Sequence, residues 1–264
     1  MELEDPDPEA DLDLLLEVAR EAGTIAMQFF GENPQQWEKA DEAGPVSEAD
    51  LAVNAYLTER LLAARPGYGL LSEETEDNAD RLARDRIFII DPIDGTRAFL
   101  KGEKGFAIAI AVVERGQVSS GVVHMPALGE TYSAAFGKGA MCNGKSILPS
   151  SRTDLEGAQA LGASASYQGQ HWPRGLPTLQ RTFRHALQWR LCLVAAGEFD
   201  LMVTMRDAYE WDVAAGALIA TEAGARITDR DGAPLIFNSQ SAKVPGVVVA
   251  PPELHDQLVA LRTH

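Results

Sequence analysis

The sequence predicts an α+β fold in which helices and strands are partly segregated along the chain. Three observations carry this prediction. Residues 11–30 have the apolar spacing of a helix, residues 106–136 have the texture of consecutive strands, and the second half mixes helical segments with a buried strand. Strands and helices do not alternate regularly, which disfavours a doubly wound parallel sheet. We therefore expect helices packed in layers against sheets.

The first third of the chain is expected to form two helices and one buried strand. Apolar residues recur at helical spacing over residues 11–30, and a loop over residues 31–45 follows. Ser47 then precedes a second apolar-periodic segment, which should end before Pro66. The apolar, β-branched run 87–90 predicts a buried strand, and Pro92 is expected to end its ladder because proline lacks a backbone donor.

The rest of the chain is expected to form a meander followed by mixed elements. Segments 106–113, 118–124 and 131–136 are separated by short turn sequences, which predicts three antiparallel strands. Further on, we expect helices over residues 187–196 and 213–223, a buried strand over 247–250 and a last helix beginning near Pro252. One domain, residues 1–264, is predicted, with an acidic tail over 1–10 and a seam near 145–158.

Charge and composition narrow the function classes. Of the 264 residues, 39 are acidic and 23 basic, which gives a net charge of −16 and disfavours binding to nucleic-acid polymers or anionic membranes. No apolar run approaches the roughly 20 residues of a membrane span, and the acidic start is unlike a signal peptide. We therefore expect a cytoplasmic protein acting on a small molecule. An anionic ligand would need positive charge supplied within the site.

A paired-aspartate motif after the predicted buried strand is the strongest chemical signal. Gly95 allows a sharp turn, and a short helix starting at Thr96 would present amide groups to an anion. Carboxylate oxygens beside amide donors suit Mg²⁺ that holds a phosphate. Two consecutive surface turns are the alternative explanation. The motif reads Asp91-Pro92-Ile93-Asp94-Gly95-Thr96.

Other acidic residues have both a structural and a functional interpretation. Glu73 follows an apolar stretch and could belong to a solvated loop, and Asp212 could cap the helix that it precedes. Asp50 has capping-box spacing from Ser47, yet one of its oxygens could still orient a neighbouring hydroxyl. Phosphatases that form an aspartyl-phosphate use an Asp-x-Asp pattern, whereas Asp91 and Asp94 are three apart, so that mechanism is disfavoured.

Taken together, these motifs resemble the inositol monophosphatase superfamily in order and spacing. The resemblance runs from about Leu12 to Leu261. It implies a layered α-β-α-β-α sandwich of the inositol monophosphatase and fructose-bisphosphatase type, and a Mg²⁺-dependent, lithium-sensitive phosphomonoesterase that forms a homodimer. The matching motifs are Lys39-Ala40-Asp41, Pro45-Val46-Ser47-Glu48-Ala49-Asp50, Ser72-Glu73-Glu74, Asp91 to Thr96 and Trp211-Asp212-Val213-Ala214-Ala215-Gly216.

The resemblance also implies a role for each matching residue. Glu73, Asp91 and the Ile93 carbonyl would hold one Mg²⁺. Asp91, Asp94 and Asp212 would hold a second, and Glu73 would share a third. Thr96, hydrogen-bonded to Asp50, would orient the attacking water. The backbone amides of Gly95 and Thr96 would bind the phosphate. No covalent enzyme nucleophile is needed for such a reaction, since positioning and charge neutralisation dominate phosphoryl transfer.

The sequence departs from the family where the substrate would bind. Inositol-specific members carry a glutamate seven residues before the Trp-Asp aspartate, where this chain has Met205 followed by Arg206. Arg206 suits a second anionic group on the substrate, which favours bisphosphate nucleotides. However, Ala163-Ser164-Ala165-Ser166 stands where many bisphosphate nucleotidases have Ser-Arg-Ser-His, and Ala186-Leu187 where the family has Gly-Ser.

The substrate therefore stays open at this point. Inositol monophosphate and a 3',5'-bisphosphate nucleotide are the leading candidates, with histidinol phosphate third. A non-catalytic, metal-dependent binding protein that kept the fold is the alternative from another class.

Overall fold

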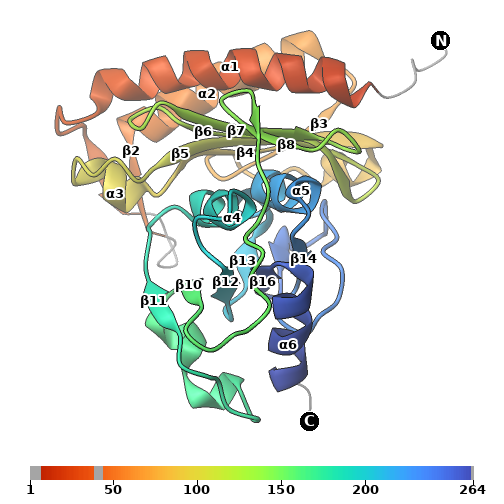
Figure 1. The fold of residues 1–264 in the computed structure, drawn as a ribbon. Coiled ribbons are helices and arrows are strands. Elements are labelled where there is room, and N and C mark those ends of the chain that lie inside the picture. Colours follow the sequence, from red (N-terminus) through yellow and green to blue (C-terminus); the bar gives the residue numbers. More distant parts are fainter. Residues whose placement is uncertain (1–6, 39–43, 263–264) are drawn as a thin grey trace.

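The fold is a sandwich of five alternating helical and sheet layers (Figure 1). The computed structural model describes residues 7–38 and 44–262. Two long helices cover one face of a seven-stranded sheet, two helices lie between that sheet and a five-stranded sheet, and the last helix packs on the far side. This arrangement confirms the expected α+β class and the α-β-α-β-α layers. The motif Lys39-Ala40-Asp41 and the first six residues of the acidic tail lie outside the described residues.

The outer helical layer consists of α1 (Pro8–Phe29) and α2 (Glu48–Ala64). α1 begins three residues before the predicted start, because an Asp7 carboxylate oxygen accepts the Glu9 and Ala10 amides at 3.0 and 3.2 Å and Pro8 suits the first helical position. α2 follows Ser47 as predicted. Their apolar faces pack on one face of the large sheet in a cluster that includes Leu15, Leu57 and Phe88.

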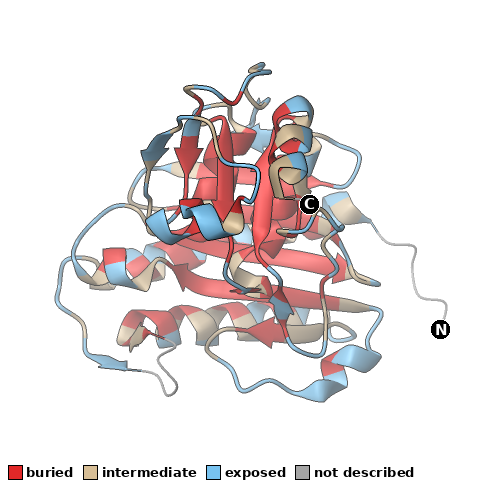
Figure 2. Ribbon diagram, turned by 90° about the horizontal axis from the view of Figure 1, so that it is seen from below, coloured by how far each residue is buried: buried red, intermediate tan, exposed pale blue. Residues whose placement is uncertain are grey.

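The seven-stranded sheet contains the predicted meander. β3 pairs parallel with β4, and the following strands pair antiparallel in chain order. Small and β-branched residues fill both faces, and Figure 2 shows the inner strands of both sheets buried along most of their length. The edge strands β9 and β11 (Gln180–Thr182) are mostly exposed. The strands are β3 (Gly69–Ser72), β4 (Arg86–Asp94), β5 (Ala107–Glu114), β6 (Gln117–Met125), β7 (Glu130–Ala135), β8 (Ala140–Cys142) and β9 (Lys145–Ser146).

The expectation that Pro92 ends the strand was wrong. β4 continues through Pro92 to Asp94, and the register with β5 shifts between Asp91, opposite Ala109, and Asp94, opposite Ala107. Proline is tolerated at such an irregularity because the ladder is already interrupted there and no amide donor is needed. The bulge also changes which side chains share a face. The step from Asp91 to Asp94 covers three residues of β4 but only two residues of β5, from Ala109 to Ala107.

The second half adds a five-stranded sheet with helices on both sides. The predicted helices appear as α4 (Leu187–Ala195) and α5 (Ala214–Ala223), and the last helix as α6 (Pro252–Arg262). The predicted strand 247–250 is β16 (Val247–Ala250), at the core of this sheet. The other strands, which the sequence did not predict, are β10 (Gln159–Leu161), β11 (Gln180–Thr182), β12 (Leu201–Thr204) and β14 (Arg226–Thr228).

Short elements complete the described chain. The predicted loop over 31–45 contains β1 (Gln36–Glu38) and the first residue of β2 (Pro45–Ser47), which pair antiparallel. The remaining pieces are α3 (Thr96–Leu100), β13 (Ala208–Tyr209), β15 (Lys243–Val244) and the 3₁₀ turns η2 (Ala79–Ala83), η3 (Ser164–Tyr167), η4 (Gly169–His171) and η5 (Glu210–Asp212).

The expected seam and the expected absence of a membrane span can be compared with the structure. Residues 145–158, where a seam was expected, start in β9 and then run from the large sheet down to the small one (Figure 1). Organisation as one domain stays a prediction. None of the helices in the described ranges has both the length and the apolar character that a bilayer crossing requires.

Candidate active site

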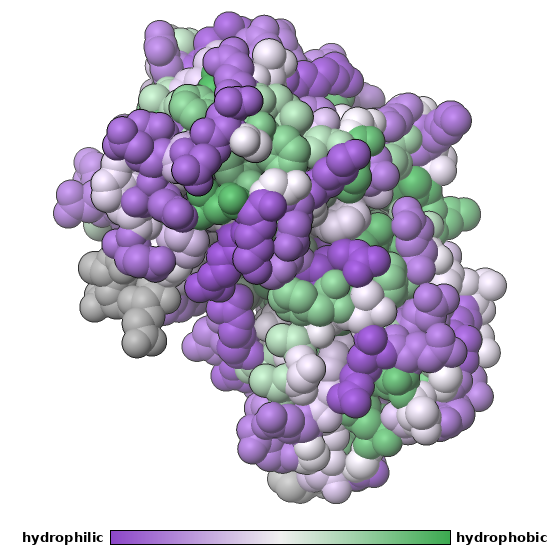
Figure 3. All heavy atoms as spheres, turned by 90° about the vertical axis from the view of Figure 1, so that its left-hand side faces the viewer, coloured by the Kyte–Doolittle hydropathy of each residue, from purple (hydrophilic) through white to green (hydrophobic). Residues whose placement is uncertain are grey.

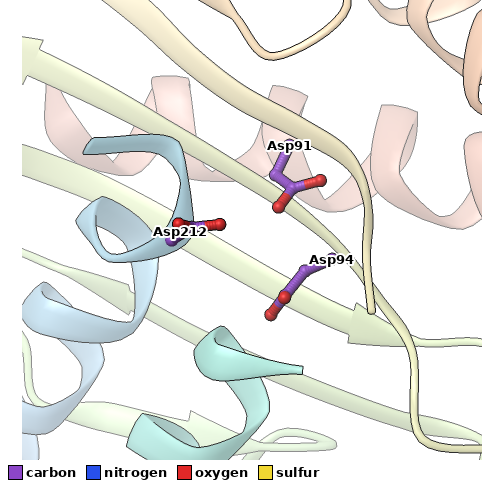
Figure 4. A group of neighbouring side chains, drawn as sticks. All are labelled: Asp91, Asp94 and Asp212. Atoms are coloured by element: carbon purple, nitrogen blue, oxygen red, sulfur yellow. The ribbon is translucent and has the colours of Figure 1, made fainter. Parts of the chain in front are cut away.

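Three aspartates from two separate parts of the fold converge on one point. Asp91 and Asp94 lie at the end of β4, and Asp212 lies in η5, just before α5 (Figure 4). One carboxylate oxygen from each lies within 4.8 Å of the others. Asp91 and Asp94 are three apart, so a regular strand would place them on opposite faces. The bulge in β4 brings their carboxylates together, which the argument from an extended chain did not foresee.

Asp91 is the most deeply buried member of this aspartate cluster. Its side chain is 1% exposed, and within the described ranges neither of its carboxylate oxygens has a hydrogen-bond donor. Burial raises the pKa of Asp91 well above its usual value, and the nearby charges of Glu73, Asp94 and Asp212 raise it further. A buried carboxylate without donors is costly, so these oxygens are placed for a cation.

Asp94 is held by the start of α4. The Leu187 and Gln188 amides donate to its two carboxylate oxygens at 3.0 and 2.6 Å. These amides belong to the first turn of a helix and have no partner within it, so the carboxylate satisfies them and sits at the positive end of the helix dipole. Burial nevertheless raises the pKa of Asp94 to about 8, with Asp212 adding repulsion.

Asp212 is fixed from its own turn and from α4. Its Oδ2 accepts the amide of Tyr209, the residue before η5, at 3.2 Å. In the described ranges Asp212 forms no side-chain cap of α5, so the alternative in which it caps that helix was wrong. The Gln188 side chain donates to the Trp211 carbonyl at 2.6 Å and accepts the Gly216 amide at 2.7 Å, which ties η5 and α5 to α4. Burial, followed by repulsion from Glu73, raises the pKa of Asp212 to about 6. Gln188 thus connects the turn carrying Asp212 to the helix that holds Asp94.

Thr96 and Asp50 form a second group beside the aspartate cluster. Thr96 Oγ1 lies 3.2 Å from Asp50 Oδ1 and 3.1 Å from the Ile93 carbonyl oxygen. The other carboxylate oxygen of Asp50, Oδ2, accepts both the Ser47 amide at 2.8 Å and the Ser47 hydroxyl at 2.6 Å. Asp50 therefore closes the predicted capping box with one oxygen and contacts Thr96 with the other. Burial raises the pKa of Asp50.

Gly95 shapes the turn between the aspartates and α3. Its φ of +94° lies in the left-handed region, and an added Cβ would lie 3.0 Å from the Gly105 carbonyl oxygen. Only glycine adopts this conformation without strain at such a close contact. The expected short helix does start at Thr96, so the amides of its first turn lie beside the aspartates.

One cavity of about 520 Å³ brings most of the predicted site residues together. Its wall includes the end of β4, α3 and residues from the second half of the chain. α3 and β11 lie on the face of the molecule that Figure 3 shows. Hydrophilic and hydrophobic residues are mixed on this face. Asp50 contacts the cavity residue Thr96 from behind. The predicted residues in the wall are Glu73, Asp91, Ile93, Asp94, Gly95, Thr96, Arg206 and Asp212.

Glu73 lies beside Asp91 at the edge of the aspartate cluster. It lines the cavity just after β3, and its amide donates to the Ile90 carbonyl at 3.3 Å. Its negative charge raises the pKa of Asp91 and of Asp212. The group of closely converging carboxylate oxygens among the described residues nevertheless consists of the three aspartates.

Sequence reasoning missed two residues in this region. Gln188 and Arg190 both lie in α4, which was predicted only as a helix. Arg190 lines the cavity and is 5% exposed. A charged side chain inside an apolar helical segment is the signal that could have found it, since arginine is rarely buried without a partner.

Comparison with known proteins defines the class. The Thermotoga maritima IMPase structure superposes with a TM-score of 0.81 at 30% identity, over 96% of each chain. The fructose-1,6-bisphosphatase/inositol-1-monophosphatase of Thermotoga maritima is 35% identical over 84% of this chain and 85% of its own. The histidinol-phosphatase of Chlorobaculum parvum is 32% identical over 87% and 90%. The CysQ 3'(2'),5'-bisphosphate nucleotidase of Salmonella typhimurium is 30% identical over 88% and 95%. The chain is therefore a phosphatase that hydrolyses phosphate monoesters.

The family follows from the match over nearly the full sequence. Residues 7–264 match the inositol monophosphatase family. The chain belongs to this family, as the motifs predicted. The names of these relatives give four different substrates, so similarity alone does not select the ester that this chain cleaves.

Proposed function

We propose that this phosphatase is Mg²⁺-dependent and cleaves a small soluble phosphate ester by attack of water on phosphorus. The observation that carries the proposal is the aspartate cluster, in which Asp91, without a hydrogen-bond donor among the described residues, lies beside Asp94 and Asp212 with oxygens within 4.8 Å. Two carboxylates about 4 Å apart repel by roughly 4 kcal/mol at an effective dielectric constant near 20. Such a buried arrangement is favoured by cations placed between the carboxylates.

The donor set of the cluster fits magnesium. It offers carboxylate oxygens alone, without a histidine or cysteine that would favour zinc or a softer metal. Asp91, Asp94 and Asp212, with Glu73 and the Ile93 carbonyl, would hold two or three Mg²⁺ ions. When bound, the ions supply the positive charge that attracts a phosphate to a chain of net charge −16 and stabilises the leaving oxygen.

Thr96 and Asp50 are assigned to the attacking water. The Thr96 hydroxyl donates its proton to Asp50, which leaves a lone pair of the same oxygen to accept a hydrogen bond from water in the cavity. Asp50 is itself fixed by Ser47, so the hydroxyl has a defined direction. In the reaction the water oxygen forms a bond to phosphorus and the ester P–O bond breaks, and the proton that the water loses is balanced by the proton that the leaving oxygen takes up to become an alcohol. The amides of Gly95 and Thr96 would bind the phosphate oxygens.

The cavity sets the size of the substrate. A volume of about 520 Å³ suits a small organic ester. Inositol monophosphate and a 3',5'-bisphosphate nucleotide are the leading candidates, and histidinol phosphate comes third because its cationic group would approach Arg206. A non-catalytic binding protein is the competing function, and it would keep the cation site but release no phosphate.

Phosphate release from a panel of esters tests the proposal. The panel holds inositol 1-phosphate, adenosine 3',5'-bisphosphate, fructose 1,6-bisphosphate and histidinol phosphate, each assayed with Mg²⁺, with EDTA and with Mg²⁺ plus Li⁺. We expect phosphate release to require Mg²⁺ and to be inhibited by Li⁺, as the resemblance to the family implies. Metal binding by calorimetry without hydrolysis of any ester would support the binding-protein alternative.

The homodimer and the cytoplasmic location stay predictions from the resemblance and from the acidic sequence. Light scattering at several protein concentrations tests the first, and fractionation of cells that express the protein tests the second.

A further inference from the structure

Arg190 is a buried cation with almost no partner. Its side chain is 5% exposed, and its one hydrogen bond within the described ranges is a long contact of 3.4 Å from Nε to the Ala186 carbonyl. No carboxylate of the described residues forms an ion pair with it. A guanidinium has five N–H donors, so most of its hydrogen-bonding capacity is unused. Because buried charges are ordinarily paired, the guanidinium of Arg190 is suited to bind an anionic group of a ligand.

The place of Arg190 in α4 sets it close to the aspartate cluster. The first two residues of this helix, Leu187 and Gln188, donate their amides to Asp94. The N-terminal end of the helix accordingly lies beside Asp94 in Figure 4. Arg190 follows Leu187 by three residues, on the same side of the helix and about 4.5 Å further along its axis. Both Arg190 and Asp94 line the cavity. An ester held at the cluster can therefore reach Arg190 with its next substituent.

The neighbours of Arg190 leave its charge available to a ligand. Asp94 and Asp212 act on it from the cluster, but cations bound there would neutralise those carboxylates. Arg206 adds a second positive charge that acts on Arg190 and also lines the cavity. The Phe183 ring, 47% exposed, lies 5.4 Å from the Arg190 guanidinium carbon and restricts its movement. The cavity thus combines two arginines with the aspartate cluster.

We propose that Arg190 is the residue that selects esters carrying a second anionic group, which it binds as a fork together with the charge of Arg206. The substrate class is then a bisphosphate, in preference to a monophosphate or to an ester with a cationic substituent such as histidinol phosphate. This inference rests on the proposed function, because the first phosphate must be held at the aspartate cluster. It goes beyond Arg206, which is exposed and visible from the sequence.

Matched pairs of esters test the inference. Adenosine 3',5'-bisphosphate is compared with adenosine 3'-phosphate, and fructose 1,6-bisphosphate with fructose 1-phosphate, since nucleotides and sugars both offer the second phosphate. A charge-assisted hydrogen bond contributes enough to change affinity about 10- to 100-fold. For wild type we expect kcat/KM to be at least about 10-fold higher for the bisphosphate in one of the two pairs.

Substitutions of Arg190 then separate selection from general support. R190Q should lower kcat/KM for the preferred bisphosphate about 30-fold, chiefly through KM, and lower that of its monophosphate far less. R190K should retain part of the preference, because it keeps the charge and loses the fork. R181Q is the matched control, because Arg181 also lies over an aromatic ring, Tyr167, but does not line the cavity. It should keep the wild-type ratio.

Each outcome decides one of the two proposals. If wild type cleaves none of the four esters or the panel above, the proposed function fails. If wild type cleaves esters but shows no preference in either pair, or if R190Q and R190K lower both members of a pair equally, the Arg190 inference is overturned while the phosphatase stands. If a thermal melt shows that R190Q is unfolded, the Arg190 inference is still tested by the ratio of kcat/KM between bisphosphate and monophosphate in wild type and in R190K.

Discussion

The hydroxyl of Thr96 lies 3.2 Å from a carboxylate oxygen of Asp50, which precedes it by 46 residues. The contact joins the first residue of α3 to the first turn of α2. Since the other Asp50 oxygen is engaged by Ser47, the direction of the Thr96 hydroxyl is fixed by the N-terminus of a helix and not by the loop alone. The cap of α2 is therefore joined directly to the candidate active site.

Removing the Thr96 hydroxyl should leave the attacking water without its orienting group, while the shape of the site stays unchanged. We expect T96V to lower kcat by about 100-fold or more with little change in KM, because valine is nearly isosteric but cannot hydrogen-bond. T96S keeps the hydroxyl and should retain most activity. Steady-state kinetics with Mg²⁺ measure both variants. A T96V enzyme within threefold of wild type would remove Thr96 from the reaction.

Neutralising Asp94 should abolish turnover. D94N keeps the size of the side chain but loses a charge from the aspartate cluster and places an amide donor against the Leu187 or Gln188 amide. We expect kcat/KM to fall more than about 100-fold, comparable to the loss of one preorganised charge interaction. The matched control is D85N, since Asp85 is exposed and its side chain forms an ion pair with Arg115 at 3.6 Å. Near-normal hydrolysis by D94N would refute this role.

A methyl group at Gly95 should disturb the turn between the aspartates and α3. In G95A the left-handed φ of +94° adds strain, and the new Cβ meets the Gly105 carbonyl oxygen at 3.0 Å. We expect unfolding free energy to fall by about 2 kcal/mol, measured by urea denaturation, together with a loss of activity. G102A is the control, because Gly102 also has a positive φ of +70° but no atom of the described residues lies within 4 Å of an added Cβ. Equal destabilisation of the two variants would show that the close contact does not matter.

Magnesium should stabilise the protein more at high pH than at low pH. The folded-state pKa values of Asp94, about 8, and Asp212, about 6, lie above the usual value of an aspartate near 3.9 because of burial and repulsion. The protonated carboxyls stabilise the metal-free fold below about pH 4, and that contribution is lost as the pH rises towards 8. We expect the Mg²⁺-induced increase in Tm to be larger at pH 8 than at pH 5.5.

Differential scanning fluorimetry in EDTA and in Mg²⁺ measures this dependence. D94N removes one of the titrating carboxyls and should reduce the difference between the two pH values. An increase in Tm that is the same at both pH values would show that the aspartate cluster is not where the cation binds.

Local sequence pattern was enough to predict the large elements. The periodicity around Leu15 and the capping box of Ser47 and Asp50 predicted α1 and α2, and the meander was confirmed strand for strand. These features depend on neighbours within a few residues. By contrast, β12 has four buried residues without alternation, so a short strand covered on both faces left no pattern to identify.

The chemistry of the site was predicted more fully than its supports. The acidic residues are recognisable by type and spacing, whereas contacts across the fold have no local signature. Examples are the α4 amides on Asp94, the Gln188 bridge to Gly216 and the bulge that aligns Asp91 with Asp94. Arg190 belongs with these, because its lack of a partner becomes visible only once its surroundings are known.

The central claim is that the aspartate cluster holds divalent cations that bind the phosphoryl group. Anomalous X-ray diffraction from crystals soaked with Mn²⁺ and inorganic phosphate tests it most directly. The account predicts Mn²⁺ peaks bonded to oxygens of Asp91, Asp94 and Asp212, with the phosphate on the same ions. Saturating Mn²⁺ that gives no peak at these carboxylates, in an enzyme that still hydrolyses its ester, would contradict it.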